Sequence, residues 1–173
     1  MGPGGPNTTT FTLSTTVPTT SVMPVLVLQP SFISQSALTQ ALGAPFAYVN
    51  GPTGPVGRGI LLNFTNNYNS SSSYVSVTLV EYNSSYLAGA VYNQSYNYML
   101  SSGAVHYAGT YKNQSYFILN STYKTNGLPS NLYVAIGQNH NYVITVYGTE
   151  IGKIFGLPQF INVMNDQIAA MYG

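Results

Sequence analysis

Hydrophobic and polar residues alternate with a period of two over much of the chain, which predicts a β-rich protein. The clearest case is residues 74–82, where Val75, Val77, Leu79 and Glu81 fall on one side. This spacing is typical of a strand with one face buried. Further strands are predicted from alternation or from β-branched and aromatic content at residues 46–49, 58–65, 104–111, 115–123, 132–136 and 142–147.

Stretches rich in Gly, Pro, Asn and Ser separate these strands and predict loops. Residues 50–57 and 66–73 are predicted to be surface loops. Residues 112–114 predict a tight connection, and residues 137–141 predict the turn of a β-hairpin. Short connections of this kind favour antiparallel strand pairs.

Three segments have helical signals instead. Residues 33–43 form a short predicted helix with Ser34 as its N-cap and Gly43 just beyond its last turn. Residues 85–100 follow a capping serine but carry an incomplete apolar stripe. Residues 158–172 predict the most regular amphipathic helix. Its apolar side consists of Leu157, Phe160, Ile161, Met164, Ile168 and Met171.

The order of these elements predicts an α+β fold. We expect a β-rich antiparallel sheet with two or three helices on one face, plus an extended N-terminal strand. An all-β sandwich is the alternative if the middle helix is in fact a strand, because its tyrosine-rich sequence is ambiguous. Residues 1–21 are predicted to be an extended tail, and residues 22–173 a single globular β-rich domain.

The N-terminal segment Asn7–Leu28 is apolar and β-prone but has no evident partner nearby in sequence. A strand of this kind needs a sheet in which to lie. Phe11, Leu13 and Val17 fall on one side of its first half, which is the candidate donor strand to a neighbouring subunit. Its second half, residues 22–28, is expected to pack on its own domain.

Charged residues are almost absent from the chain. Lys, Arg, Asp and Glu make up 4% of it, against roughly 25% in a typical soluble domain. Few protons then distinguish the folded from the unfolded state, so stability should depend little on acid, as suits an acidic exterior. Four basic residues cannot neutralise a run of phosphates, which argues against nucleic acid as a partner.

The expected environment is extracellular. No apolar run approaches the ~18 residues of a transmembrane helix, and residues 1–6 lack the pattern of a signal peptide. If the protein is exported, we therefore expect this chain to be the mature form. With no cysteine, disulfides and thiolate metal ligands are excluded.

Asn-x-Ser/Thr sequons are more frequent than the Asn, Ser and Thr content would give by chance. This excess favours N-glycosylation of a secreted protein. The alternative is that they reflect the richness of the chain in Asn, Ser and Thr. The candidate glycosylation sites are Asn7, Asn63, Asn69, Asn83, Asn93, Asn113 and Asn120.

Motifs that carry catalytic chemistry are not found. His106 and His140 have no second imidazole or carboxylate at metal-ligand spacing. The serines are outside any G-x-S-x-G motif, and the Gly-rich residues 51–59 lack the Lys-Ser/Thr ending of a phosphate loop. We therefore expect a protein that is not an enzyme, with no catalytic residue, cofactor or metal.

In low charge, absence of cysteine, dense sequons and a β-prone tail, the chain resembles secreted surface proteins of thermoacidophilic archaea. Among these it most resembles subunits of glycosylated, thread-like filaments, on the basis of Thr8–Leu28 and the seven sequons. The resemblance implies donor-strand complementation, in which copies of the chain polymerise head-to-tail as the N-terminal strand inserts into the next subunit. The alternative is a secreted or surface-anchored monomeric domain that binds a ligand such as carbohydrate, with a Thr-rich linker.

Overall fold

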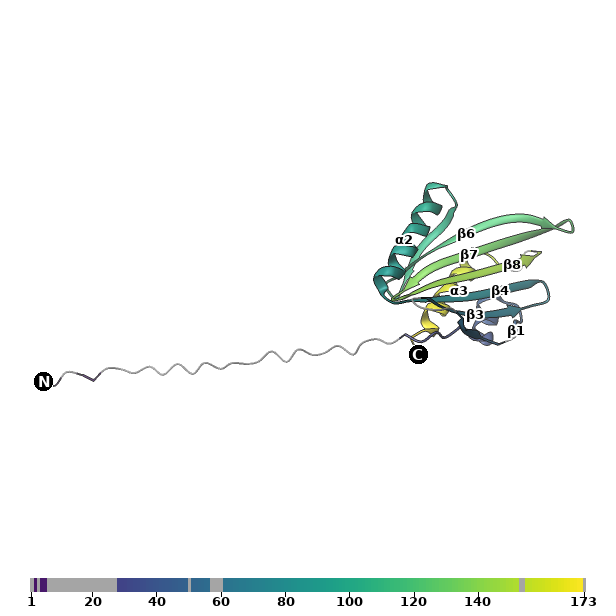
Figure 1. Cartoon of the computed structure of the whole chain (residues 1–173). Helices are drawn as coiled ribbons and strands as arrows, with labels where there is room; N and C mark the ends of the chain where they lie inside the picture. Colours follow the sequence, from purple (N-terminus) through teal and green to yellow (C-terminus); the bar gives the residue numbers. More distant parts are fainter. Residues whose placement is uncertain are drawn as a thin grey trace.

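A computed structural model describes residues 2, 4–5, 28–49, 51–56, 61–152 and 155–172 of the chain. This part is an α+β fold with one β-rich antiparallel sheet and three helices (Figure 1). In chain order the elements are α1 (Gln35–Leu42), β1 (Ala47–Tyr48), β2 (Thr53–Val56), β3 (Leu61–Asn69), β4 (Ser73–Tyr82), α2 (Ser85–Ser101), β5 (Val105–Tyr111), β6 (Gln114–Thr125), β7 (Leu128–Asn139), β8 (Tyr142–Ile151) and α3 (Leu157–Ala170).

All eight strands of the described residues belong to a single sheet in the order β1-β3-β4-β8-β7-β6-β5, with β2 also paired to β3. Every pairing is antiparallel. Strand β8 enters between β4 and β7, so the two halves of the sheet are joined by the last strand of the chain. Because there is one sheet in this part, the sandwich alternative is wrong for it.

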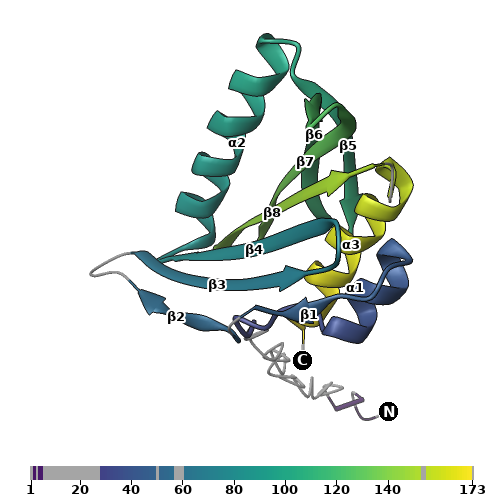
Figure 2. The same ribbon diagram turned by 90° about the vertical axis from the view of Figure 1, so that its right-hand side faces the viewer.

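One face of the sheet, called here the inner face, carries the main core. The alternating residues Val75, Val77 and Leu79 predicted from the sequence are fully buried there. Helix α3 lies on this face, where the Phe160 ring and the Met164 side chain are close to Gly148 and Gly137. Helix α1 packs beside α3 (Figure 2). Apolar burial on this face is the main favourable term in folding.

Helix α2 lies on the opposite, outer face of the sheet (Figure 2). The rings of Tyr92 and Tyr96 contact Phe117, with centroids 5.8 and 5.4 Å apart. Gly89 faces the side chain of Gln138. Two helices therefore share one face, and the third is opposite them, whereas the sequence expectation allowed for all three on one face. The weak apolar stripe of α2 gives no indication of which face it covers.

Two predicted loops are wrong in part. Residues 66–69 continue β3, and residues 53–56 form β2, so only 70–72 remain as the connection to β4. Asn66 and Tyr68 point inward and are buried opposite Val77 and Val75. Asn is a poor strand former, so local sequence favours a loop, and pairing with β4 overrides that preference.

The later hairpins are longer than predicted. Strands β7 and β8 continue until Asn139 pairs with Tyr142, leaving a two-residue turn at 140–141. Strands β6 and β7 meet at Asn126-Gly127, whose φ angles are 51° and 79°. Asn-Gly with positive φ at both residues is the preferred two-residue hairpin turn. This signal was present in the sequence and would have identified the β6–β7 hairpin.

The start of the domain is fixed to α3. The Gln29 N–H donates to the Met171 carbonyl at 3.1 Å. The buried Gln167 side chain accepts from the Ile33 N–H and donates to the Ser31 carbonyl, each at 2.9 Å. The predicted boundary between residues 21 and 22 lies outside the described residues, as does the whole segment 6–27.

Candidate assembly edge and surface sites

The sheet ends on one side in an open edge. Strand β5 is the last strand in the order, and among the described residues it pairs only with residues 114–119 of β6. Residues 120–125 of β6 pair with β7 on one side and with no described strand on the other. We call β5 together with residues 120–125 the open edge. Its outward backbone groups can pair with another strand.

The register of the β5–β6 hairpin shows which backbone groups face outward. Tyr111 pairs with Gln114 across a two-residue turn in which Lys112 and Asn113 have φ angles of 49° and 61°. The pair that flanks such a turn exchanges both of its hydrogen bonds. Because hydrogen-bonded and non-bonded pairs alternate along an antiparallel ladder, Ala108 and Thr110 direct their N–H and C=O groups away from β6.

The two edges of the sheet are protected differently. At the far edge, the short strands β1 and β2 both cover β3, and β2 contains Pro55, which cannot donate to a further strand. Strand β5 carries no Lys, Arg, Asp, Glu or Pro. Lys112 lies in the turn after β5, and Lys124 lies in residues 120–125 of β6, the other part of the open edge. Natural sheets usually protect an edge with charges or Pro, so β5 is the less protected of the two edges.

The described sequons are on the surface with one exception. The side chains of five of them are exposed: Asn63, Asn69, Asn83, Asn93 and Asn113. Asn120 is half-buried on the inner-face side of β6, where its side chain hydrogen-bonds Tyr133. A glycan at Asn120 would break that bond, whereas the other five sites are accessible. Asn7 lies outside the described residues.

The predicted donor-strand residues Phe11, Leu13 and Val17 also lie outside the described residues. Residues 28–34 begin the first long stretch that the structure describes, and they lie along α3 on the inner-face side. The structure thus describes an edge that can accept a strand.

The His, Asp and Glu side chains do not gather into a metal site in the described part of the chain. No group of three or more His, Asp or Glu side chains there could hold a metal ion. His106 is on the exposed side of β5, and the His140 Nδ1 is 3.0 Å from the Asn139 Oδ1. Glu81 is 3.5 Å from the Asn141 amide. Burial raises the pKa of the Asp166 carboxyl above its usual value.

Glu150 has a structural role that sequence reasoning missed. It is fully buried and accepts hydrogen bonds from the Asn131 amide at 2.7 Å and from the Phe155 N–H. These bonds join the end of β8 to β7 and to the segment that leads into α3. The alternation of β8 places Glu150 on the inner face, a signal that could have identified it.

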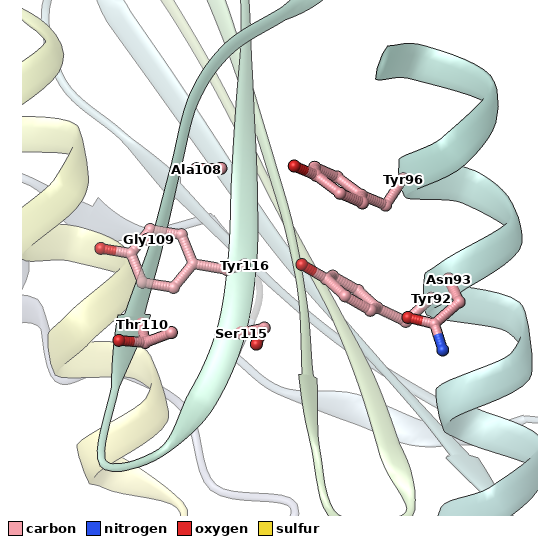
Figure 3. A pocket seen from close by; sticks show the side chains of 8 residues that line it. All are labelled: Tyr92, Asn93, Tyr96, Ala108, Gly109, Thr110, Ser115 and Tyr116. Atoms are coloured by element: carbon pink, nitrogen blue, oxygen red, sulfur yellow. The ribbon is translucent and has the colours of Figure 1, made fainter. Parts of the chain in front are cut away.

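An aromatic pocket lies between α2 and the open edge (Figure 3). Its cavity volume is about 370 Å³. The rings of Tyr92 and Tyr96 are parallel, with centroids 6.2 Å apart, and their hydroxyl ends point toward β5 and β6. Burial is the main cause that raises the pKa of Tyr92 to about 12, with the neighbouring Tyr96 as the second cause, so the Tyr92 phenol is neutral at ordinary pH. The (i, i+4) spacing of the two tyrosines on a predicted helix was the available sequence signal.

No helix of the described residues is both long and apolar enough to cross a membrane. No protein-family model matches the chain, and no curated protein matches it. Among solved structures it is similar to the extracellular domain of PknH from Mycobacterium tuberculosis. The two share 11% sequence identity over 78% of this chain and 90% of that one, with a TM-score of 0.48. This likeness is too low to support an inference about function.

Proposed function

We propose that the protein is the structural subunit of an extracellular, glycosylated, homopolymeric filament. In this proposal the N-terminal strand of one subunit pairs with the open edge of the next. The open edge is the main observation that supports this proposal. It occurs in a chain whose N-terminal tail is apolar and β-prone.

Backbone hydrogen bonds would supply much of the contact, as in β-strand addition generally. Ala108 and Thr110 present outward N–H and C=O groups to the incoming strand. Phe11, Leu13 and Val17 would then lie on one side of the new edge. A contact between the tail of one subunit and the edge of another is heterologous, so it does not close on itself and gives a fibre.

The dimensions of the tail are compatible with this contact. The 10 residues of Thr8–Val17 would extend over ~33 Å as a strand, which is longer than the seven residues of β5. The hinge of residues 18–21 that follows can add up to ~13–14 Å when extended. This length allows the strand to reach an edge outside its own subunit.

Charge and glycans are also compatible with assembly. The low charge of the chain reduces repulsion between identical copies. None of the seven sequons lies in β5 itself, although Asn113 is in the turn after it and Asn120 is in the part of β6 that belongs to the open edge. Glycans on the exposed sites would keep the polymer soluble while leaving the backbone edge accessible. An acidic extracellular setting fits the small number of titrating groups.

Electron microscopy tests whether the tail is needed for assembly. The full chain is expected to form filaments, and a variant lacking residues 1–20 is expected to remain monomeric, with its domain still folded by circular dichroism. Phe11→Asp with Leu13→Asp should have the same effect, because charge would be buried in the contact. Filaments that persist unchanged without residues 1–20 would contradict strand donation.

Engineered disulfides test which edge accepts the strand. The chain has no cysteine, so one introduced pair gives an unambiguous readout. We expect Leu13→Cys in one copy to cross-link with Ala108→Cys or Thr110→Cys in another under oxidising conditions. The matched control is Thr53→Cys, on the protected edge, which should not cross-link. Equal cross-linking at Thr53 would exclude β5 as the specific acceptor.

A further inference from the structure

The pocket between α2 and the open edge exists because large and small side chains face each other. Tyr92 and Tyr96 project from α2, and the strands opposite them carry Ala108, Thr110 and Ser115 (Figure 3). The ring of Tyr116 points away from the pocket toward the inner face. Phe117 contacts both tyrosine rings and holds them in place. The space is therefore built by side chains on three elements, α2, β5 and β6.

The chemistry of the lining indicates the class of ligand. No Lys, Arg, His, Asp or Glu lines the pocket. The polar groups are two phenols, the Asn93 amide and the hydroxyls of Thr110 and Ser115. An ionic ligand would find no counter-charge there. A ligand with an apolar face and several neutral hydroxyl groups matches both the rings and their polar neighbours.

The cavity volume of about 370 Å³ lies in the range of small-molecule sites, ~300–1,000 Å³. It is open to solvent, because the lining residues Asn93, Ala108, Thr110 and Ser115 are exposed. A short section of a longer chain can therefore enter it from the surface.

We propose that this pocket binds a neutral saccharide, which packs against Tyr92 and Tyr96 and hydrogen-bonds to Thr110, Ser115 and the phenol groups. The pocket is formed within one subunit by side chains of α2, β5 and β6, although Ala108 and Thr110 also belong to the edge that strand addition would use. The saccharide can come from two sources. One is an external neutral polysaccharide, and the other is a glycan on Asn93, which is both a sequon and part of the rim.

Calorimetric titration of unglycosylated protein tests the site. The probes are gluco-, manno- and N-acetylglucosamine hexasaccharides, together with the oligosaccharide released from the glycosylated protein itself. We expect at least one neutral probe to bind and a sulfated hexasaccharide to bind at least 10-fold more weakly. Binding of none of the neutral probes up to millimolar concentration, or stronger binding of the sulfated one, would overturn the proposal.

Two variants locate the binding. Tyr96→Ala should weaken binding of the neutral probe at least 10-fold, because it removes one aromatic wall. Ala108→Leu should do the same by filling the cavity from the strand side while leaving both tyrosines in place. The matched control is Tyr98→Ala, since Tyr98 is on the same helix, 69% exposed and outside the pocket. Wild-type affinity in both pocket variants, with thermal midpoints showing that they fold, would refute the site.

Glycosylated protein distinguishes the two sources. If the glycan on Asn93 occupies the pocket, an external probe should bind glycosylated Asn93→Gln but not glycosylated wild type. If the ligand is external, both should bind it. Either result supports a saccharide site, provided that Tyr96→Ala abolishes the binding. Binding to Asn93→Gln that survives Tyr96→Ala would contradict it.

Discussion

At the scale of single residues, buried hydroxyl and amide groups fix the packing where charges are absent. The Tyr68 hydroxyl donates to the Ile33 carbonyl and accepts from the Asn66 amide at 3.0 Å. The Asn66 Oδ1 is buried with no hydrogen-bond partner among the described atoms. Burial is the main cause that raises the pKa of Tyr68 above its usual range. This phenol joins β3 to the segment before α1.

We expect Tyr68→Phe to reduce the free energy of unfolding by ~1–3 kcal/mol, because the Ile33 carbonyl and Asn66 amide lose a buried partner. Urea denaturation measures the change. Tyr98→Phe is the control, since Tyr98 is exposed and should give no measurable change. An equal loss of unfolding free energy in the two variants would show that the Tyr68 hydrogen bonds do not cause the change.

At the scale of elements, glycines on the inner face of the sheet allow α3 to approach. A Cβ on Gly148 would lie 2.7 Å from the Phe160 ring, and one on Gly137 would lie 2.4 Å from the Met164 Cε. The Phe160 ring is fully buried and packs on Tyr133, with centroids 5.2 Å apart, so it has little room to move. Met164 is flexible and can adjust more easily.

We therefore expect Gly148→Ala to lower stability by ~1–3 kcal/mol through overpacking, and Gly137→Ala to cost less. Thermal or denaturant unfolding of both variants gives the comparison. In the double variant Gly148→Ala with Phe160→Leu, the smaller side chain should relieve part of the clash, so the two effects should not add. Additive losses of stability would mean that the Phe160 ring is not the group that clashes with the new Cβ.

At the scale of the whole molecule, few groups couple stability to pH. The folded state raises the pKa of Asp166 by burial, so it holds the proton more tightly than the unfolded state does. Its contribution to stability is complete below the unfolded pKa of about 3.8 and is lost as pH rises through the higher folded value. Acid therefore favours the fold at this residue.

Asp166→Asn should raise the free energy of unfolding at pH 7 but leave it unchanged at pH 3, because Asn resembles the protonated carboxyl. The gain should be below ~1 kcal/mol, since the side chain is partly exposed and solvent screens its charge. Denaturant midpoints at the two pH values measure it. A variant equally stabilised at both values would rule out the carboxyl charge as the cause.

Ionisation of buried tyrosines should set the upper pH limit of the folded state. Burial raises the pKa of Tyr92 and of Tyr142 to about 12, with Tyr96 and Glu81 as the secondary causes. The stability linked to these raised pKa values is complete below pH 10 and is lost as pH rises through 12. Unfolding followed by circular dichroism should therefore begin above pH 10, together with the tyrosinate absorbance of the buried phenols. Loss of structure at pH 9 would contradict this account.

The sequence by itself determined what depends on neighbouring residues. The alternation over residues 74–82 identifies β4 and its buried side, because side chains in a strand alternate between faces. Ser34 and Gly43 mark the ends of α1, and Ser84 begins α2, because caps satisfy backbone groups within one turn. The scarcity of charge is also a property of the sequence alone. The fold class followed from these elements.

Only the tertiary structure decided which distant elements meet. The placement of β8 between β4 and β7, the open edge at β5 and the position of α2 on the outer face depend on long-range pairing, which local patterns do not encode. Pairing with β4 also converts residues 66–69 from an apparent loop into strand. The aromatic pocket needs Tyr92 and Tyr96 on one element and Ala108 and Ser115 on two others, so it exists only when the helix and sheet are packed together.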